Sequence, residues 1–108
     1  MNYKNVTIAG SGVLGSQIAF QTAFKGFNVT IYDINESAIE QAKNRIINLE
    51  DTYVAYFKNE QEAARSAQSR IQYATDLKVA TANADLVIEA IPELKEIKIN
   101  FYTELSKV

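Results

Sequence analysis

A glycine-rich turn between two apolar runs constrains this chain more than any other feature. Residues 6–9 (Val-Thr-Ile-Ala) read as a buried strand, and residues 10–15 (Gly-Ser-Gly-Val-Leu-Gly) follow it directly. A helical pattern comes next, and a second apolar run over residues 29–32 ends at Asp33, eighteen residues after Gly15. This order of strand, G-x-G-x-x-G turn, helix, strand and acidic residue is typical of a dinucleotide-binding site.

Each part of the motif has a physical role in such a site. Gly10 permits a sharp turn off the strand, Gly12 lets backbone N–H groups approach a pyrophosphate, and Gly15 lets the helix pack close to the strand. The helix N-terminus adds a partial positive charge for the phosphates. Asp33 stands where a carboxylate accepts hydrogen bonds from ribose hydroxyls. A tight turn without a ligand is the alternative for the motif alone, and the surrounding elements favour the dinucleotide.

The choice of dinucleotide follows from charge. The Asp33 carboxylate repels the 2′-phosphate of NADP and accepts a hydrogen bond from the free 2′-hydroxyl of NAD. The next three residues, Ile34, Asn35 and Glu36, include no Arg or Lys that would pair with a phosphate. FAD uses a similar fingerprint and stays open at this point. The residues favour NAD.

The composition excludes several classes of function. With 47% apolar and 22% charged residues, the 108 residues are expected to fold as one domain, and a net charge of −2 gives no footprint for nucleic acid or an anionic membrane. Cysteine and histidine are absent, which removes thiolate chemistry and the commonest general acid/base, and we expect no metal site. The apolar runs are too short to span a membrane, and the early first strand leaves no room for a signal peptide, so a cytoplasmic location is expected by elimination.

Periodicity predicts alternating strands and helices along the chain. Helices are expected over residues 14–25, from a cap at Asn35 to about 57, and over 61–68, with a helical turn over 77–82 capped by Asp76. Further strands are expected over residues 71–74 and 86–91, and a last helix over 93–108. This alternation predicts an α/β, Rossmann-type, doubly wound parallel sheet with strand order 3-2-1-4.

The connection after the second strand is unusually long. An ordinary crossover needs about a dozen residues, whereas residues 35–69 separate Asp33 from the next strand. We therefore expect a helical arm that projects from the domain. Its aromatic residues Tyr53, Tyr56 and Phe57 form either a small core of the arm itself or a surface for a substrate or a second domain.

The motifs together resemble those of a known family. They are similar to the NAD-binding domain of the L-3-hydroxyacyl-CoA dehydrogenases, which include the 3-hydroxybutyryl-CoA dehydrogenases. The similar parts are the glycine-rich turn, the Tyr32-Asp33 strand end, the long helical insertion, and residues 84–93 (Ala-Asp-Leu-Val-Ile-Glu-Ala-Ile-Pro-Glu) with Lys98. The resemblance covers residues 1–108. It implies a domain that lacks the later strands of the fold, a protein that oxidises the 3-hydroxyl of an acyl-CoA to a ketone with NAD, and a homo-oligomer.

The resemblance also implies roles for individual residues. Asp33 would bind the adenosine ribose, Ile34 would touch the adenine, and Glu93 and Lys98 would reach the nicotinamide half of NAD. A plain surface ion pair is the alternative for Glu93 and Lys98. Ala90 and Ile91 would line the nicotinamide side. The pyrophosphate would be held by Gly10, Ser11, Gly12, Val13, Leu14 and Gly15.

The match is weaker where the family binds coenzyme A. The family positions, usually a hydroxyl residue and a lysine on the helical arm, fall near Leu49 and Tyr56, and the nearest basic candidates for the phosphates are Lys43, Arg45 and Lys58. The family's catalytic serine, histidine and glutamate lie beyond Val108, so the 108 residues alone are expected to be inactive. Two alternatives remain open: a stand-alone NAD(H)-sensing module, and the front half of another two-domain hydroxyacid dehydrogenase.

Overall fold

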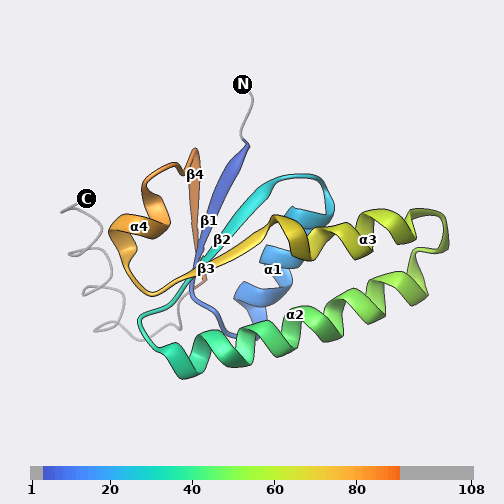
Figure 1. The fold of residues 1–108 in the computed structure, drawn as a ribbon, viewed down its shortest axis with the longest axis horizontal. Helices are drawn as coiled ribbons and strands as arrows, with labels where there is room; N and C mark the ends of the chain where they lie inside the picture. The colour runs from blue at the N-terminus through green and yellow to red at the C-terminus, as the bar shows by residue number, and fades with distance from the viewer. Residues whose placement is uncertain (1–3, 91–108) are drawn as a thin grey trace.

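Four parallel strands form the sheet at the centre of the molecule. The computed structural model describes residues 4–90 and places β1 (Asn5–Ala9), β2 (Asn28–Tyr32), β3 (Ile71–Ala74) and β4 (Leu86–Glu89) in the order β3-β2-β1-β4 (Figure 1). This is the order predicted from the sequence. Ala9 pairs with both Tyr32 and Glu89, so the carboxyl ends of β1, β2 and β4 meet at one edge of the sheet.

The helices begin where the sequence supplies caps. The Asn35 side chain accepts hydrogen bonds from the backbone N–H groups of Ser37 and Ala38 at the start of α2, and Asp76 caps α4 in the same way. The helices are α1 (Val13–Phe24), α2 (Glu36–Tyr56), α3 (Gln61–Ala67) and α4 (Leu77–Thr81), with 3-10 turns at Lys58–Glu60 and Gln68–Arg70. None of these described helices combines the length and apolar character needed to cross a membrane.

The fourth strand is shorter than predicted. Its assigned pairing ends at Glu89, although the Ala90 N–H still donates a 2.8 Å hydrogen bond to the Ala9 carbonyl. The predicted continuation to Ile91 and the predicted helix over 93–108 lie outside the described residues.

Side chains alternate between two cores, one on each face of the sheet. On the face covered by α1, α2 and α3, the strand residues Ile8, Val29 and Ile31 pack against the helix residues Phe20 and Ile46. The opposite face forms a smaller cluster with α4, made of Ala9, Tyr32, Leu77 and Ala80. Helices on both faces are the doubly wound arrangement that the alternating pattern predicted.

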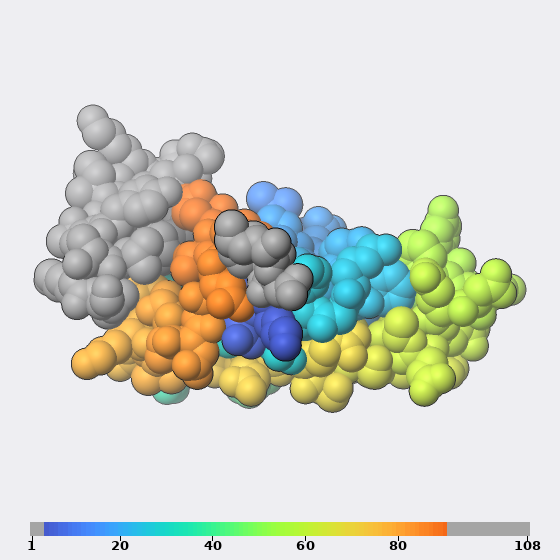
Figure 2. All heavy atoms as spheres, turned by 90° about the horizontal axis from the view of Figure 1, so that it is seen from above, coloured from blue at the N-terminus to red at the C-terminus, as the bar shows by residue number. Residues whose placement is uncertain are grey.

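The insertion after β2 forms a helical hairpin whose two helices, α2 and α3, both pack against α1. Figure 1 shows α2 and α3 side by side, and in Figure 1 and Figure 2 the turn between them lies at one end of the molecule, away from the strands. The Tyr53 ring lies 4.7 Å from that of Phe20 and 5.0 Å from that of Phe24, and Phe57 lies 5.3 Å from Phe24. The cluster therefore joins the arm to α1, whereas Tyr56 is 77% exposed.

Candidate cofactor-binding site

The glycine-rich loop turns sharply between β1 and α1. Gly10 has a φ of +114°, which disfavours any side chain, and its N–H donates a 2.8 Å hydrogen bond to the Tyr32 carbonyl. A Cβ at position 15 would overlap the Gly10 carbonyl oxygen and lie 3.6 Å from the Cβ of Ala90. Glycine at position 15 is thus required by the close approach of α1 to the loop, as the motif predicted.

The N-terminus of α1 is open. Gly12 occupies the capping position with no side chain to bond the first N–H groups, and the first turn carries no acidic residue. A Cβ at Gly12 would meet nothing within 4 Å, so packing does not require glycine there. The N–H groups of the first turn lack intrahelical partners and carry partial positive charge, which suits them to an anion.

Asp33 is held in place at the carboxyl end of β2. Its Oδ2 accepts hydrogen bonds from the Ser11 hydroxyl at 2.7 Å and the Ser11 N–H at 3.2 Å, and its Oδ1 accepts one from the Asn35 N–H at 3.1 Å. A carboxylate offers about four acceptor positions, so capacity remains for a further donor. Ser11 is buried and Asp33 half-buried, and the neighbouring Ile34 side chain is 79% exposed.

These features border one hollow of about 490 Å³ at the carboxyl ends of the strands. Asp33 and Ala90 line it, together with five loop residues: Gly10, Ser11, Gly12, Val13 and Leu14. Gly15 is buried behind the loop, and Ile34 is not part of the lining. Ile91, Glu93 and Lys98 lie outside the described residues.

The hollow also includes four residues that the sequence analysis did not assign to it: Ala38, Gln41, Arg45 and Glu89. The first three recur at three- and four-residue steps along α2, directly after Asp33, so they share one face of the helix. That spacing is the sequence signal that could have placed these three residues at the site. Arg45 donates a 3.2 Å hydrogen bond from Nη1 to the Ser11 carbonyl, which joins α2 to the loop.

The positions considered for coenzyme A are spread along α2 and the arm. Leu49 packs against the core, so its side chain is occupied by the fold. Lys43 pairs with Glu40 at 3.2 Å and lies 5.4 Å from the centre of the Tyr73 ring, and Lys58 begins the turn at the end of the arm. Of the three basic candidates, only Arg45 lines the hollow.

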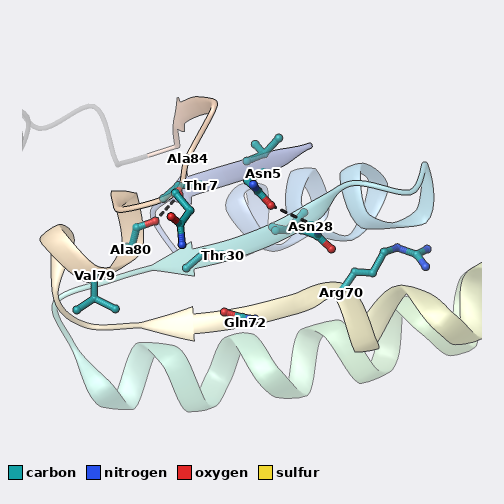
Figure 3. Close-up of a pocket in the computed structure, with 12 residues that line it drawn as sticks. Asn5, Thr7, Asn28, Thr30, Arg70, Gln72, Val79, Ala80 and Ala84 are labelled. Carbon is teal, nitrogen blue, oxygen red and sulfur yellow. Dashed lines mark hydrogen bonds between the residues drawn. The ribbon is translucent and has the colours of Figure 1, made fainter. Parts of the chain in front are cut away.

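A second cavity, of about 300 Å³, lies on the sheet face beside α4 (Figure 3). The Thr7 hydroxyl donates to the Ala80 carbonyl, and the Asn28 amide donates to Asn5 Oδ1 at 3.2 Å. Arg70 donates from Nε and Nη2 to the Ala23 carbonyl at the end of α1. Thr7 and Asn28 therefore pair with other lining residues and Arg70 with Ala23 outside the lining, and none of the lining residues belongs to the glycine-rich loop. Among the described residues, no group of three or more side chains is arranged to hold a metal ion.

Comparison with known proteins identifies related sequences and structures. Residues 5–108 match the family described as "3-hydroxyacyl-CoA dehydrogenase, NAD binding domain". A probable 3-hydroxyacyl-CoA dehydrogenase of Caenorhabditis elegans is 40% identical over 94% of this chain and 35% of its own length. A probable 3-hydroxybutyryl-CoA dehydrogenase of Bacillus subtilis is 32% identical over all of this chain and 37% of its own length.

Two solved structures show the same arrangement. A diketoreductase that acts on dicarbonyl compounds superposes with a TM-score of 0.93 at 48% identity, covering 99% of this chain and 38% of its own. The 3-hydroxybutyryl-CoA dehydrogenase of Escherichia coli K12 gives a TM-score of 0.86 at 33% identity, covering 99% of this chain and 22% of its own. The chain thus spans between 22% and 38% of the length of these four proteins.

Proposed function

Because this chain belongs to the family of 3-hydroxyacyl-CoA dehydrogenase NAD-binding domains, we propose that the hollow beside the glycine-rich loop holds NAD. The observation that carries this proposal is the placement of Asp33 next to the open N-terminus of α1. One ribose-binding carboxylate and one anion-binding helix end border the same hollow.

The residues present fit the cofactor. Asp33, whose orientation Ser11 and Asn35 maintain, would accept hydrogen bonds from the ribose hydroxyls of the adenosine half. Gly12 and the first N–H groups of α1 would hold the pyrophosphate, since a Cβ at Gly12 would meet nothing within 4 Å. Val13 and Leu14, which are 59% and 61% exposed, supply apolar contact beside it. Ile34 lies next to Asp33 and contributes an apolar surface for the adenine.

When bound, NAD supplies a hydride acceptor, and the protein of which this domain is part uses it to oxidise the 3-hydroxyl of an acyl-CoA to a ketone. The domain's own residues bind and orient the cofactor. We propose that the 108 residues alone do not turn over substrate, because the family's catalytic serine, histidine and glutamate correspond to no residue here. General acid/base catalysis contributes typically about 10²- to 10⁴-fold, and positioning the substrate contributes more.

Titration of the purified protein with NADH and NADPH tests the cofactor assignment. NADH is expected to bind, and NADPH to bind at least about tenfold more weakly, because its 2′-phosphate meets the Asp33 carboxylate. A matched assay with NADH and acetoacetyl-CoA is expected to show no turnover by the 108 residues. Equal affinity for the two dinucleotides would contradict the role of Asp33, and lack of NADH binding would contradict the proposal as a whole.

A second candidate substrate class follows from one comparison. The diketoreductase shares 48% identity and acts on dicarbonyl compounds, and Leu49 and Tyr56 do not reproduce the hydroxyl and lysine of a coenzyme A site. The alternative is therefore reduction of a free dicarbonyl compound by the same cofactor. Assays of the whole protein with NADH separate the two: acetoacetyl-CoA and 2,4-pentanedione present similar dicarbonyl groups, and only the first carries coenzyme A.

A further inference from the structure

Arg45 joins the third turn of α2 to the glycine-rich loop. Its Nη1 donates a 3.2 Å hydrogen bond to the Ser11 carbonyl, which also accepts a 3.0 Å hydrogen bond from the Ser16 hydroxyl of α1. The carbonyl belongs to the residue immediately before Gly12, the N-cap of α1. The guanidinium is therefore held within one residue of the open helix N-terminus.

A pyrophosphate in the hollow would need positive charge from the protein beside it. Among the lining residues, Asp33 and Glu89 are acidic and Arg45 is the single basic side chain. A pyrophosphate carries two negative charges, and a helix N-terminus supplies only about half of one positive charge. Arg45 is the one side chain of the described lining that can add positive charge beside it.

The guanidinium has donors to spare. Arginine presents five N–H groups in a planar fork and stays protonated at any physiological pH. In the described part of the chain, one of these groups bonds the Ser11 carbonyl and the others have no hydrogen-bond partner. Lys43, two residues earlier on α2, offers a contrast because it is paired with Glu40 and lies outside the hollow.

We propose that Arg45 binds the pyrophosphate of the cofactor, with its guanidinium held in place by the Ser11 carbonyl. This inference rests on the proposed function of the hollow and adds a specific contact to it. Arg45 then serves the dinucleotide and not the phosphates of coenzyme A. Its contribution applies to ligands that carry phosphate and is absent for ligands that do not.

Two substitutions separate the charge of Arg45 from its place in the fold. Arg45→Met keeps an unbranched stem and removes the charge, whereas Arg45→Lys keeps the charge and loses the fork. Lys43→Met is the matched control, since it removes a cation from the same helix outside the hollow. Thermal unfolding of each variant establishes that it is folded before its affinity is measured.

The ligands are NADH, ADP and adenosine, with calorimetry for NADH and ADP and NMR titration for the weaker adenosine. Arg45→Met is expected to weaken NADH and ADP about tenfold, the value for one charge-assisted hydrogen bond, and to leave adenosine unchanged. Arg45→Lys is expected to recover part of the loss, and Lys43→Met to bind as the unaltered protein does. The salt dependence of ADP binding is expected to be shallower in Arg45→Met, because one phosphate contact is lost.

The outcomes distinguish this inference from the proposed function. An equal loss of ADP and adenosine in Arg45→Met would show that Arg45 acts only through the loop, which overturns the pyrophosphate contact. Unchanged ADP affinity in that variant would overturn it as well, while leaving NAD binding intact. Lack of NADH binding by the unaltered protein would instead refute the proposed function itself.

Discussion

The Ser11 hydroxyl donates a 2.7 Å hydrogen bond to Oδ2 of Asp33, and so links the glycine-rich loop to the end of β2. The Ser11 N–H bonds the same oxygen at 3.2 Å. The carboxylate is thereby oriented before any ligand arrives. Preorganisation of this kind lowers the entropy that a ligand loses on binding, so Ser11 is a positioning residue for the ribose contact.

Removal of the Asp33 carboxylate is expected to weaken NADH binding more than removal of the Ser11 hydroxyl does. Asp33→Ala eliminates one or two charge-assisted hydrogen bonds to the ribose, worth roughly 1.5–3 kcal/mol. Ser11→Ala is expected to cost about 1 kcal/mol, because the carboxylate remains but loses its neutral donor. Calorimetric titration with NADH measures both.

The double variant tests whether Ser11 acts through Asp33. If it does, Ser11→Ala adds little to Asp33→Ala, since the partner it orients is already gone. Additive losses in the double variant would mean that Ser11 contributes independently. Equal NADH affinity for Asp33→Ala and the unaltered protein would remove Asp33 from the site.

Much of this arrangement follows from local sequence signals. The caps at Asn35 and Asp76 and the need for glycine at position 15 each depend on a short motif whose geometry is largely self-determined. The strand order follows from the alternation of strands and helices along the chain. The contacts that were missed are long-range. Arg45 meets the Ser11 carbonyl across 34 residues, and that meeting depends on how α2 lies against the loop.

The aromatic residues of the arm illustrate the same limit. Their clustering at helical spacing was visible in the sequence, but two interpretations stayed open. Tyr53 and Phe57 pack on Phe20 and Phe24 of α1, and this depends on which face of α2 the apolar stripe turns toward the sheet. Tyr56 lies about one turn from Tyr53 yet is mostly exposed, since packing between helices and not residue type decides burial.

Glycines 12 and 15 are expected to respond differently to the same substitution. Gly15→Ala places a Cβ into the Gly10 carbonyl oxygen, and such overpacking costs typically about 1–3 kcal/mol. Gly12→Ala meets no atom within 4 Å, and the weaker N-cap is offset by the lower entropy of the unfolded chain. Its NADH affinity is expected to fall, because the Cβ occupies the approach to the phosphates.

Urea unfolding and NADH titration of the two variants check this contrast. Gly15→Ala is expected to lose stability and Gly12→Ala to lose binding at nearly unchanged stability. Unaltered NADH binding by Gly12→Ala would place the pyrophosphate elsewhere. Full stability of Gly15→Ala would mean that the loop shifts without cost.

The Tyr53 side chain is expected to anchor the arm. Its ring contacts Phe20, Phe24 and Phe57, and its hydroxyl donates to Gln21 Oε1. Tyr53→Ala removes this half-buried ring and is expected to lower the free energy of unfolding by about 2 kcal/mol. Tyr56→Ala, a matched change at an exposed position of the same helix, is expected to stay within about 0.5 kcal/mol. Comparable urea midpoints for the two variants would contradict this anchoring role.

The Asp85 carboxylate is expected to make the free energy of unfolding depend on pH in the acid range. Its Oδ2 accepts 2.9 Å hydrogen bonds from the backbone N–H groups of Lys4 and Asn5, which hold the pKa of this exposed carboxyl below its ordinary value. These bonds tie the residue that precedes β4 to the start of β1. A lowered pKa means that the folded state releases the proton more readily than the unfolded state.

The stabilisation is therefore present above the ordinary aspartate pKa of about 3.9 and is lost as the pH falls through the lower pKa of the folded state. Asp85→Asn removes the charge, so this variant is expected to be less stable than the unaltered protein at neutral pH. The difference should shrink as the pH is lowered and the carboxyl becomes protonated. Asp51→Asn is the control, because Asp51 makes no hydrogen bond or ion pair with the described residues. Urea midpoints across this acid range measure the effect, and a difference that stays constant with pH would show that the carboxylate charge at position 85 is not its source.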